Sequence, residues 1–171
     1  LDVATDQVVC EFSNTDYSSG PSYHGAISRD GNLVLTSHGL SAPARLWDVG
    51  TGQLLRSVRA GTGVVAVAFS PDGQRLLTGD ADDAVRLWDV QTTNLLRTFL
   101  GHDDRIVTVA GSADGRLVAA GSRDGTSKLW EVATTNLLLT LQGHAQQVWG
   151  VAFSPDGKWV LNDTYPDGQA A

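Results

Sequence analysis

One histidine, one serine and one aspartate lie close together in this 171-residue chain and could form a hydrolase triad. They are His102, Ser122 and Asp124. In such a triad the imidazole takes the proton of the serine hydroxyl, and the carboxylate orients the imidazole. The chain contains no Gly-x-Ser-x-Gly segment, the sharp turn that exposes the nucleophile of α/β hydrolases. The residue types therefore permit a triad, but the surrounding sequence does not favour one.

Two carboxylates 42 residues earlier in the chain offer a second possible site. Asp80 and Asp82 are two positions apart, so they could bind a metal or one could have a raised pKa. The alternative, which we favour, is a solvated acidic turn. His24 and His38 have no metal-binding partner at a recognised spacing, and we expect them to be exposed or hydrogen-bonded locally. The single cysteine, Cys10, excludes an internal disulfide and a four-thiolate zinc site. We predict no catalytic residue, metal or cofactor.

Composition restricts the classes of protein. Hydrophobic residues make up 42% and charged residues 18% of the chain, which is typical of a globular domain. Its 12 Lys and Arg against 19 Asp and Glu give a net charge of −7 without a basic cluster, which argues against nucleic-acid binding. No apolar run is long enough to span a membrane. The 19 glycines and five tryptophans favour many tight turns in a repeated β architecture.

Three sequence markers recur with one period. Asp-Gly pairs begin at positions 30, 72, 114 and 156, each 42 residues after the previous one. A tryptophan followed by an acid occurs at 47, 88 and 130, at intervals of 41 and 42 residues, and Gly-His occurs at 101 and 143. Because independent markers share the period, the chain is built from repeats.

Each period reads as four short strands. In the second repeat an apolar run at 64–69 is followed by an Asp-Gly hairpin turn, where glycine accepts a positive φ without steric cost. Further strands are predicted at 74–79, 84–89 and 94–99, and Arg86 alternates with apolar neighbours as in a half-exposed strand. No segment shows a convincing helical stripe. The prediction is an all-β fold of four-stranded antiparallel blades, as in a β-propeller.

Four segments in fixed order give the chain a family resemblance. They are Gly101-His102, Ser112-Ala113-Asp114-Gly115, the segment 121–126 and Leu129-Trp130-Glu131. With these segments the chain resembles the WD-repeat β-propeller family. The resemblance implies a structural hydrogen-bond network of the Gly-His histidine, a strand-two serine, a turn aspartate and a strand-three tryptophan. The complete set corresponds to His102, Ser122, Asp124 and Trp130, and partial sets contain Asp82, Trp88 and His144.

This network favours a structural role over a triad. A buried Trp130 indole N–H needs an acceptor, and the Ser122 hydroxyl can both accept and donate a hydrogen bond. We expect the carboxylate of Asp124 to hold the imidazole, so that a loop and a turn between strands are tied together.

The repeats divide the chain as one domain of about four blades. We expect the end of a preceding blade at 1–13, full repeats at 22–60, 61–100 and 101–142, and the start of a further blade at 143–171. Propellers of the resembled family mostly have about seven or eight blades, so we expect an arc. It would belong either to a longer propeller chain or to a homodimeric ring, because an isolated arc exposes open sheet edges. The chain has no methionine and opens without a secretory pattern. From these features we expect missing initial residues and a cytoplasmic location.

The resemblance also implies a function. WD-repeat propellers act chiefly as rigid, noncatalytic scaffolds that bind a protein or peptide partner. The usual binding face is rimmed by the loops before the first strand and after the second strand of each blade. The alternatives are a propeller enzyme, such as a lyase or hydrolase with a central-channel site, and a purely structural segment of a larger protein. Large aromatic side chains and arginines are typical interface anchors, so we select Arg105, Arg123, Trp149, Tyr23 and Tyr165. Trp149 could instead pack between blades.

Overall fold

The computed structural model describes residues 24–59, 61–142 and 147–164, and every regular element in them is a β-strand. The first sheet contains β1 (Gly25–Ile27), β2 (Leu33–Thr36), β3 (Ala44–Asp48) and β4 (Leu54–Val58). The second contains β5 (Val64–Phe69), β6 (Arg75–Asp80), β7 (Val85–Asp89) and β8 (Leu95–Phe99). The third contains β9 (Ile106–Gly111), β10 (Leu117–Ser122), β11 (Ser127–Glu131) and β12 (Leu137–Leu141). The last has β13 (Val148–Phe153) and β14 (Val160–Thr164).

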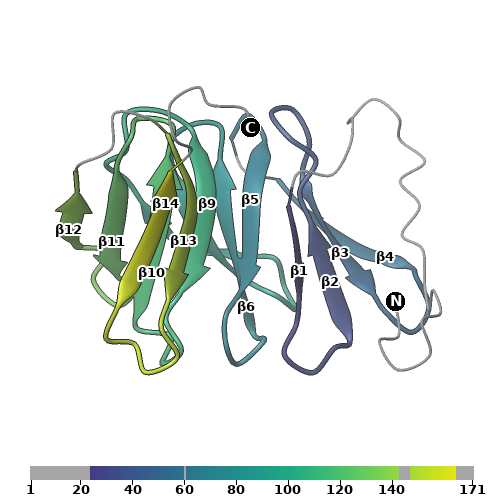
Figure 1. The fold of residues 1–171 in the computed structure, drawn as a ribbon. Coiled ribbons are helices and arrows are strands. Elements are labelled where there is room, and N and C mark those ends of the chain that lie inside the picture. Colours follow the sequence, from purple (N-terminus) through teal and green to yellow (C-terminus); the bar gives the residue numbers. More distant parts are fainter. Residues whose placement is uncertain (1–23, 60, 143–146, 165–171) are drawn as a thin grey trace, which may run out of the picture.

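The sheets are propeller blades, as the sequence predicted. In each sheet the strands follow one another in chain order, and neighbouring strands are antiparallel. The first strands β1, β5, β9 and β13 contact one another in turn and face the viewer in Figure 1. We number the sheets as blades 1 to 4 in chain order. The predicted preceding blade at 1–13 lies outside the described residues.

The first strand of each later blade packs closely against the blade before it. Ile106 of β9 and Val148 of β13 are fully buried. A Cβ added to Gly79 would lie 2.4 Å from Ile106 Cγ2, and one added to Gly121 would lie 2.5 Å from Val148 Cγ1. These contacts are shorter than carbon atoms tolerate, so glycine on the second strand allows the blades to approach. The two hydrophobic cores of the described residues lie between blades 1 and 2 and between blades 2 and 3.

Every later blade carries a β-bulge near the start of its first strand. Register shifts place the bulge at Val65, Val107 and Trp149, again with a period of 42 residues. A bulge leaves one residue unpaired and turns its side chain away from the regular alternation. Val65 and Val107 are buried, whereas Trp149 is 48% exposed. The fold therefore presents a large aromatic side chain at a position that holds valine in the other two blades.

The recurring aspartates form the hairpin turns that their spacing predicted. Ser28 Oγ donates to Asp30 Oδ1 at 2.6 Å, the Asn32 N–H donates to the same oxygen at 3.2 Å, and Gly31 has φ +75°. The hydrogen bonds, led by that of Ser28, lower the pKa of Asp30. The same Ser-x-Asp-Gly turn recurs at Asp72, Asp114 and Asp156. These aspartates shape turns, which confirms the prediction.

Candidate functional site

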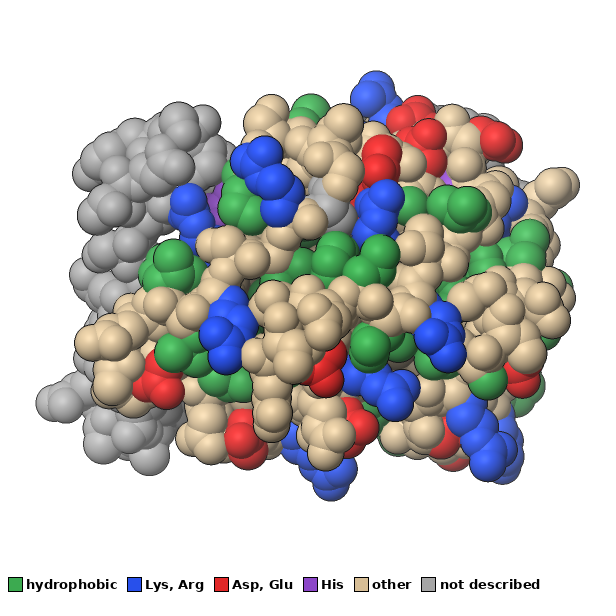
Figure 2. Space-filling model, turned by 180° about the vertical axis from the view of Figure 1, so that it is seen from behind, with side chains coloured by type: hydrophobic (Ala, Val, Ile, Leu, Met, Phe, Trp, Pro, Cys, Tyr) green, Lys and Arg blue, Asp and Glu red, His purple; other side chains and the backbone are tan. Residues whose placement is uncertain are grey.

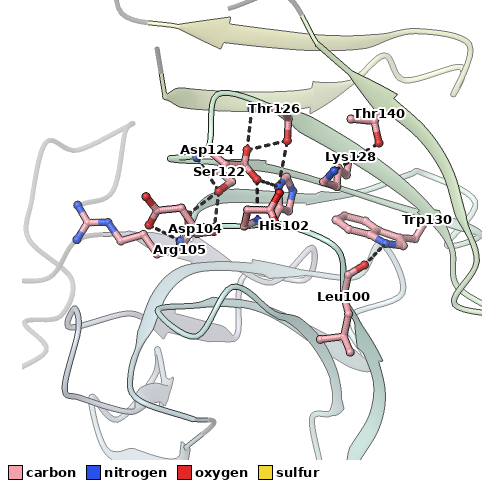
Figure 3. Close-up of polar contacts among 11 residues, drawn as sticks. Leu100, His102, Asp104, Arg105, Ser122, Asp124, Thr126, Lys128, Trp130 and Thr140 are labelled. Carbon is pink, nitrogen blue, oxygen red and sulfur yellow. Dashed lines mark hydrogen bonds and ion pairs between the residues drawn. The ribbon is translucent and has the colours of Figure 1, made fainter. Parts of the chain in front are cut away.

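Asp124 is the centre of a hydrogen-bond network at the end of blade 3 where β10 finishes (Figure 3). Its Oδ2 accepts from His102 Nδ1 at 2.8 Å and from the Asp103 N–H at 3.0 Å. Its Oδ1 accepts from the Thr126 N–H at 2.8 Å and from the Thr126 hydroxyl at 2.7 Å. One carboxylate therefore joins the loop before β9 to the turn between β10 and β11. Sequence reasoning missed Thr126, although it follows the aspartate in an Asp-Gly-Thr turn.

The Ser122 hydroxyl takes no part in a catalytic triad. Ser122 is fully buried, its Oγ donates to the Asp104 carbonyl at 2.7 Å, and the same oxygen accepts from the Asp124 N–H at 3.1 Å. Ser122 and His102 are both described, and no hydrogen bond joins them. A catalytic triad requires a hydrogen bond between its serine and its histidine. The hydroxyl instead fixes the backbone of the loop before β9.

Burial and hydrogen bonding determine the protonation states of His102 and Asp124. Burial lowers the pKa of His102, although the Asp124 carboxylate opposes that shift. The imidazole is therefore neutral at pH 7, and its Nδ1 carries the proton because a carboxylate only accepts. Partial burial would raise the pKa of Asp124, but hydrogen bonds from Thr126, the Asp103 N–H and His102 together lower it to about 2. The contact is a hydrogen bond to a charged carboxylate, with a structural role.

Trp130 does not bond to Ser122 as the resemblance implied. Its indole N–H donates to the Leu100 carbonyl at 3.1 Å, and its ring meets the His102 ring edge-on at 5.6 Å. In the other blades the equivalent indoles donate to a threonine hydroxyl of the second strand. The pairs are Trp47 with Thr36 at 2.9 Å and Trp88 with Thr78 at 3.0 Å. Blade 3 has Ala120 at the threonine position, so the Trp130 indole donates instead to the carbonyl of Leu100, which directly follows β8 of blade 2.

The second repeat holds a partly buried ion-pair triad, and the prediction of a solvated acidic turn there was wrong. Asp80 is fully buried, and Arg86 donates to its Oδ2. Arg86 also binds both oxygens of Asp82, each at 2.8 Å. Sequence reasoning treated Arg86 only as a strand residue. Its alternation in the strand after the acidic turn was the available signal.

The triad gives Asp80 an unusual pKa. Burial raises it to about 6 in spite of Arg86, and Asp80 Oδ1 has no hydrogen-bond partner within the described residues. The hydrogen bonds of Arg86 lower the pKa of Asp82. Because one guanidinium already occupies both carboxylates, the pair is not arranged as a metal site. Across residues 24–59, 61–142 and 147–164, no group of three or more His, Cys, Asp and Glu side chains could hold a metal ion.

His38, expected to be exposed or bonded locally, is buried and bonded locally. Its Nε2 lies 2.9 Å from the Thr36 hydroxyl, which also accepts the Trp47 indole. His24 is half-buried, and its N–H donates to Ser37 Oγ at 3.0 Å. Burial lowers the pKa of both histidines, so both imidazoles are neutral at pH 7. Neither forms a recognisable catalytic arrangement with the groups described above.

Three of the five selected binding residues are described, and all lie at one edge of the blades. The Arg123 N–H donates to the Arg105 carbonyl at 3.1 Å, and the Arg123 side chain is exposed. Trp149 follows Val148, the residue packed on Gly121 two positions before Arg123. The fold therefore brings Trp149 of blade 4 to the same edge as the two arginines. Two selected residues, Tyr23 and Tyr165, and the partial-set His144 lie outside the described residues.

The same edge also holds a group of carboxylates that sequence reasoning did not assemble. Asp83 follows β6, whereas Asp103 and Asp104 precede β9 in the next blade. Burial raises the pKa of Asp83, as do the charges of Asp104 and Asp82. Only the packing of neighbouring blades brings these two loops together. The edge therefore carries arginines, an exposed tryptophan and acids.

Residues 24–59, 61–142 and 147–164 include no helix with the length and hydrophobicity of a membrane span.

This chain resembles several known proteins, among them the following three. It is 40% identical over 76 residues to nuclear distribution protein PAC1 of Arthroderma benhamiae, covering 43% of this chain and 16% of that protein. It is 32% identical over 116 residues to WD repeat, SAM and U-box domain-containing protein 1 of Danio rerio, covering 61% and 24%. It is 33% identical over 114 residues to the guanine nucleotide-binding protein subunit beta of Oryza sativa subsp. japonica, covering 61% and 28%.

The aligned segments span less than a third of these relatives' lengths. A family model described as "WD domain, G-beta repeat" matches residues 52–89, 93–131 and 135–162, which together exceed half of the chain. Each match begins near the last strand of one blade and continues into the next blade, so every repeat links two neighbouring sheets. On this match and on the blades themselves, the chain belongs to the WD40-repeat family of β-propeller proteins.

Proposed function

We propose that this chain is a noncatalytic module that binds a protein or peptide partner through the edge formed by Arg105, Arg123 and Trp149. Membership of the WD40 family supports an interaction scaffold in general. The observation that carries the choice of edge is Trp149, a large aromatic that a β-bulge turns out of the sheet and leaves 48% exposed. Aromatic and arginine side chains supply much of the binding energy at protein interfaces.

The backbone that carries Arg105 and Arg123 is held by hydrogen bonds, which favours binding without a large ordering cost. Ser122 Oγ and the Arg123 N–H both bond to the loop before β9, and the Asp124 carboxylate holds the same loop through His102 and Asp103. The two arginines therefore project from a fixed frame. The edge combines them with acids of the neighbouring loops, so we expect a partner with both charged and apolar groups.

The enzyme alternative finds no support in these contacts. Ser122 is buried and bonded to backbone, and the Asp80 and Asp82 carboxylates are occupied by Arg86. We propose that the ring is completed by further blades, either of a longer chain or of a second copy. Leu161 of the last sheet favours this, since it is 66% exposed although it lies on a strand.

The edge is tested by comparing two double variants of matched residue types. Arg123→Ala with Trp149→Ala removes the proposed anchors. Arg29→Ala with Trp159→Ala removes the same residue types at the opposite edge of the blades, since Arg29 follows β1 and Trp159 precedes β14. Each protein is immobilised and its retained cell proteins are quantified by mass spectrometry. We expect a set of proteins that the unsubstituted chain and the control retain but the first variant loses. Equal retention by both variants, with unchanged thermal unfolding, would reject this edge.

A further inference from the structure

A groove runs along the outer side of the propeller between blades 2 and 3. Its volume is about 550 Å³, within the range of ligand pockets. Leu96 of β8 contributes from blade 2, and Val132 and Ala133, which follow β11, contribute from blade 3. Leu96 is 37% exposed. The groove therefore has an apolar part that is open to solvent.

Three arginines border this apolar part. Arg75 begins β6, Arg97 lies on β8 and Arg116 precedes β10, and all three are exposed. They are three of only 12 Lys and Arg residues in a chain of net charge −7. Within the described residues, neither Arg75 nor Arg97 forms an ion pair within 4.0 Å. Arg97 donates one hydrogen bond, to the Leu96 carbonyl at 2.7 Å.

Acidic groups near the groove only partly offset this charge. Glu131 is the acid of the lining, and its Oε2 accepts from the Thr134 hydroxyl at 2.6 Å. Arg116 lies 3.9 Å from Asp114, in a pair whose side chains are 84% and 58% exposed. Such an exposed ion pair contributes little to stability, so Arg116 can exchange Asp114 for the carboxylate of a ligand. The positive charge of Arg75 also favours the ionised form of two nearby turn acids, Asp72 and Asp89. The lining itself has three positive charges and one negative charge.

The neighbouring groove between blades 1 and 2 shows that these arginines are not a general property of the repeat. It is lined by Leu33, Leu46, Leu55, Arg56, Val90 and Gln91, and its volume is about 210 Å³. One period earlier, the positions of Arg75 and Arg116 are held by Leu33 and Gln74. Arg56 is the counterpart of Arg97. The groove between blades 2 and 3 is thus larger and has two additional arginines.

We propose that this groove is a second binding site, which takes an extended peptide segment of a partner protein that carries carboxylates beside a leucine-like side chain. Charge complementarity selects the acidic peptide, and Leu96, Val132 and Ala133 accept the apolar side chain. Guanidinium groups bind carboxylates through two parallel hydrogen bonds, which gives the site its preference for acids. Figure 2, seen from the side of the outer strands, shows basic side chains next to hydrophobic ones.

The site goes beyond the proposed function because it is separate from the edge that holds Arg123. Arg116 precedes β10 and Arg123 follows it, so the two arginines lie at opposite ends of one strand. A partner could therefore occupy the groove while another occupies the edge.

The groove is tested with the full chain and a fluorescein-labelled acidic peptide, Glu-Glu-Leu-Glu-Glu, followed by fluorescence anisotropy. Arg75→Leu with Arg116→Gln installs the two residues of the neighbouring groove at exposed positions. We expect this variant to bind the peptide at least tenfold more weakly than the unsubstituted chain. A matched variant, Arg29→Gln with Arg59→Gln, makes the same charge change at two exposed arginines outside the groove and should bind within twofold. Circular dichroism confirms that each variant keeps its sheets.

Two further titrations separate the peptide from other anions. Replacing the peptide's leucine by serine should weaken binding at least fivefold, since the apolar part of the groove is then unused. The proposal is overturned if the groove variant binds normally, if the serine peptide binds equally well, or if the control loses as much affinity. It is also overturned if vesicles containing phosphatidylserine bind in an Arg75-dependent way while the peptide does not bind.

Discussion

Replacing Asp124 by asparagine removes the charge at the centre of the blade 3 network and little volume. The carboxylate accepts four hydrogen bonds, two of them from the N–H groups of Asp103 and Thr126. The amide of asparagine keeps one acceptor oxygen, and its NH₂ group would face donors. Either the His102 side or the Thr126 side therefore loses its acceptor.

The pKa of Asp124 gives the magnitude. The folded value is about 2 and the reference value is 3.8, and the side chain is only 9% exposed. One pKa unit corresponds to about 1.4 kcal/mol, so the charged carboxylate contributes about 2 kcal/mol to the free energy of unfolding at pH 7. Because the folded pKa is the lower one, this contribution is complete above the unfolded value. It is lost as the pH falls toward 2.

Urea unfolding followed by tryptophan fluorescence measures this contribution, because Trp130 is buried beside His102. Asp124→Asn should lower the free energy of unfolding by about 2 kcal/mol at pH 7 and by less than about 1 kcal/mol at pH 2.5. The matched control is Asp103→Asn, which changes the same charge at an exposed residue of the adjoining loop. We expect the control to change stability by less than about 0.5 kcal/mol. A loss below that value for Asp124→Asn at pH 7, or an equal loss at both pH values, would refute the reasoning.

Three further predictions concern the triad, the blade contacts and the ring. Arg86→Met leaves the buried Asp80 without its partner and should lower the free energy of unfolding by about 3 kcal/mol at pH 8. The loss should be smaller at pH 5, where Asp80 takes up a proton, and urea unfolding at both pH values measures it. A loss independent of pH would contradict the raised pKa of Asp80. Gly79→Ala places a Cβ 2.4 Å from Ile106 and should lower the free energy of unfolding by about 1–3 kcal/mol. The control Gly111→Ala, whose Cβ has its nearest neighbour at 3.5 Å, should lower it less. Equal melting temperatures of the two variants would disprove close packing at Gly79. Light scattering during gel filtration should give twice the monomer mass or larger species, and a stable monomer at all concentrations would show that the arc needs no further blades.

The three full blades were predictable because their signals are local. An Asp-Gly pair with a serine two residues before the aspartate forms a turn by its own hydrogen bonds, as at Ser28 and Asp30. Alternation in a strand such as β7 reports one buried and one exposed face. Repetition every 42 residues then implies one four-stranded sheet per period. The family resemblance followed from these same residues.

The roles of particular polar side chains required the tertiary structure. Asp80 was predicted to lie in a solvated turn, but the folded chain buries it fully and Arg86 holds it, since a buried carboxylate needs a partner. The Trp130 indole bonds to Leu100 of the preceding blade because its own sheet offers Ala120 in place of a threonine.

By itself, then, the sequence determined the all-β class, the period and the turns, because each depends on residues that are close along the chain. The tertiary structure decided which charges are enclosed by partners and which face solvent. Arg86 is enclosed by two carboxylates, whereas Arg75, Arg97 and Arg116 border one open groove although 41 residues separate the first from the last. The physical reason is that the free energy of a charge depends on its burial and on the charged groups that folding brings close to it. Neither is written in the spacing of residues along one strand.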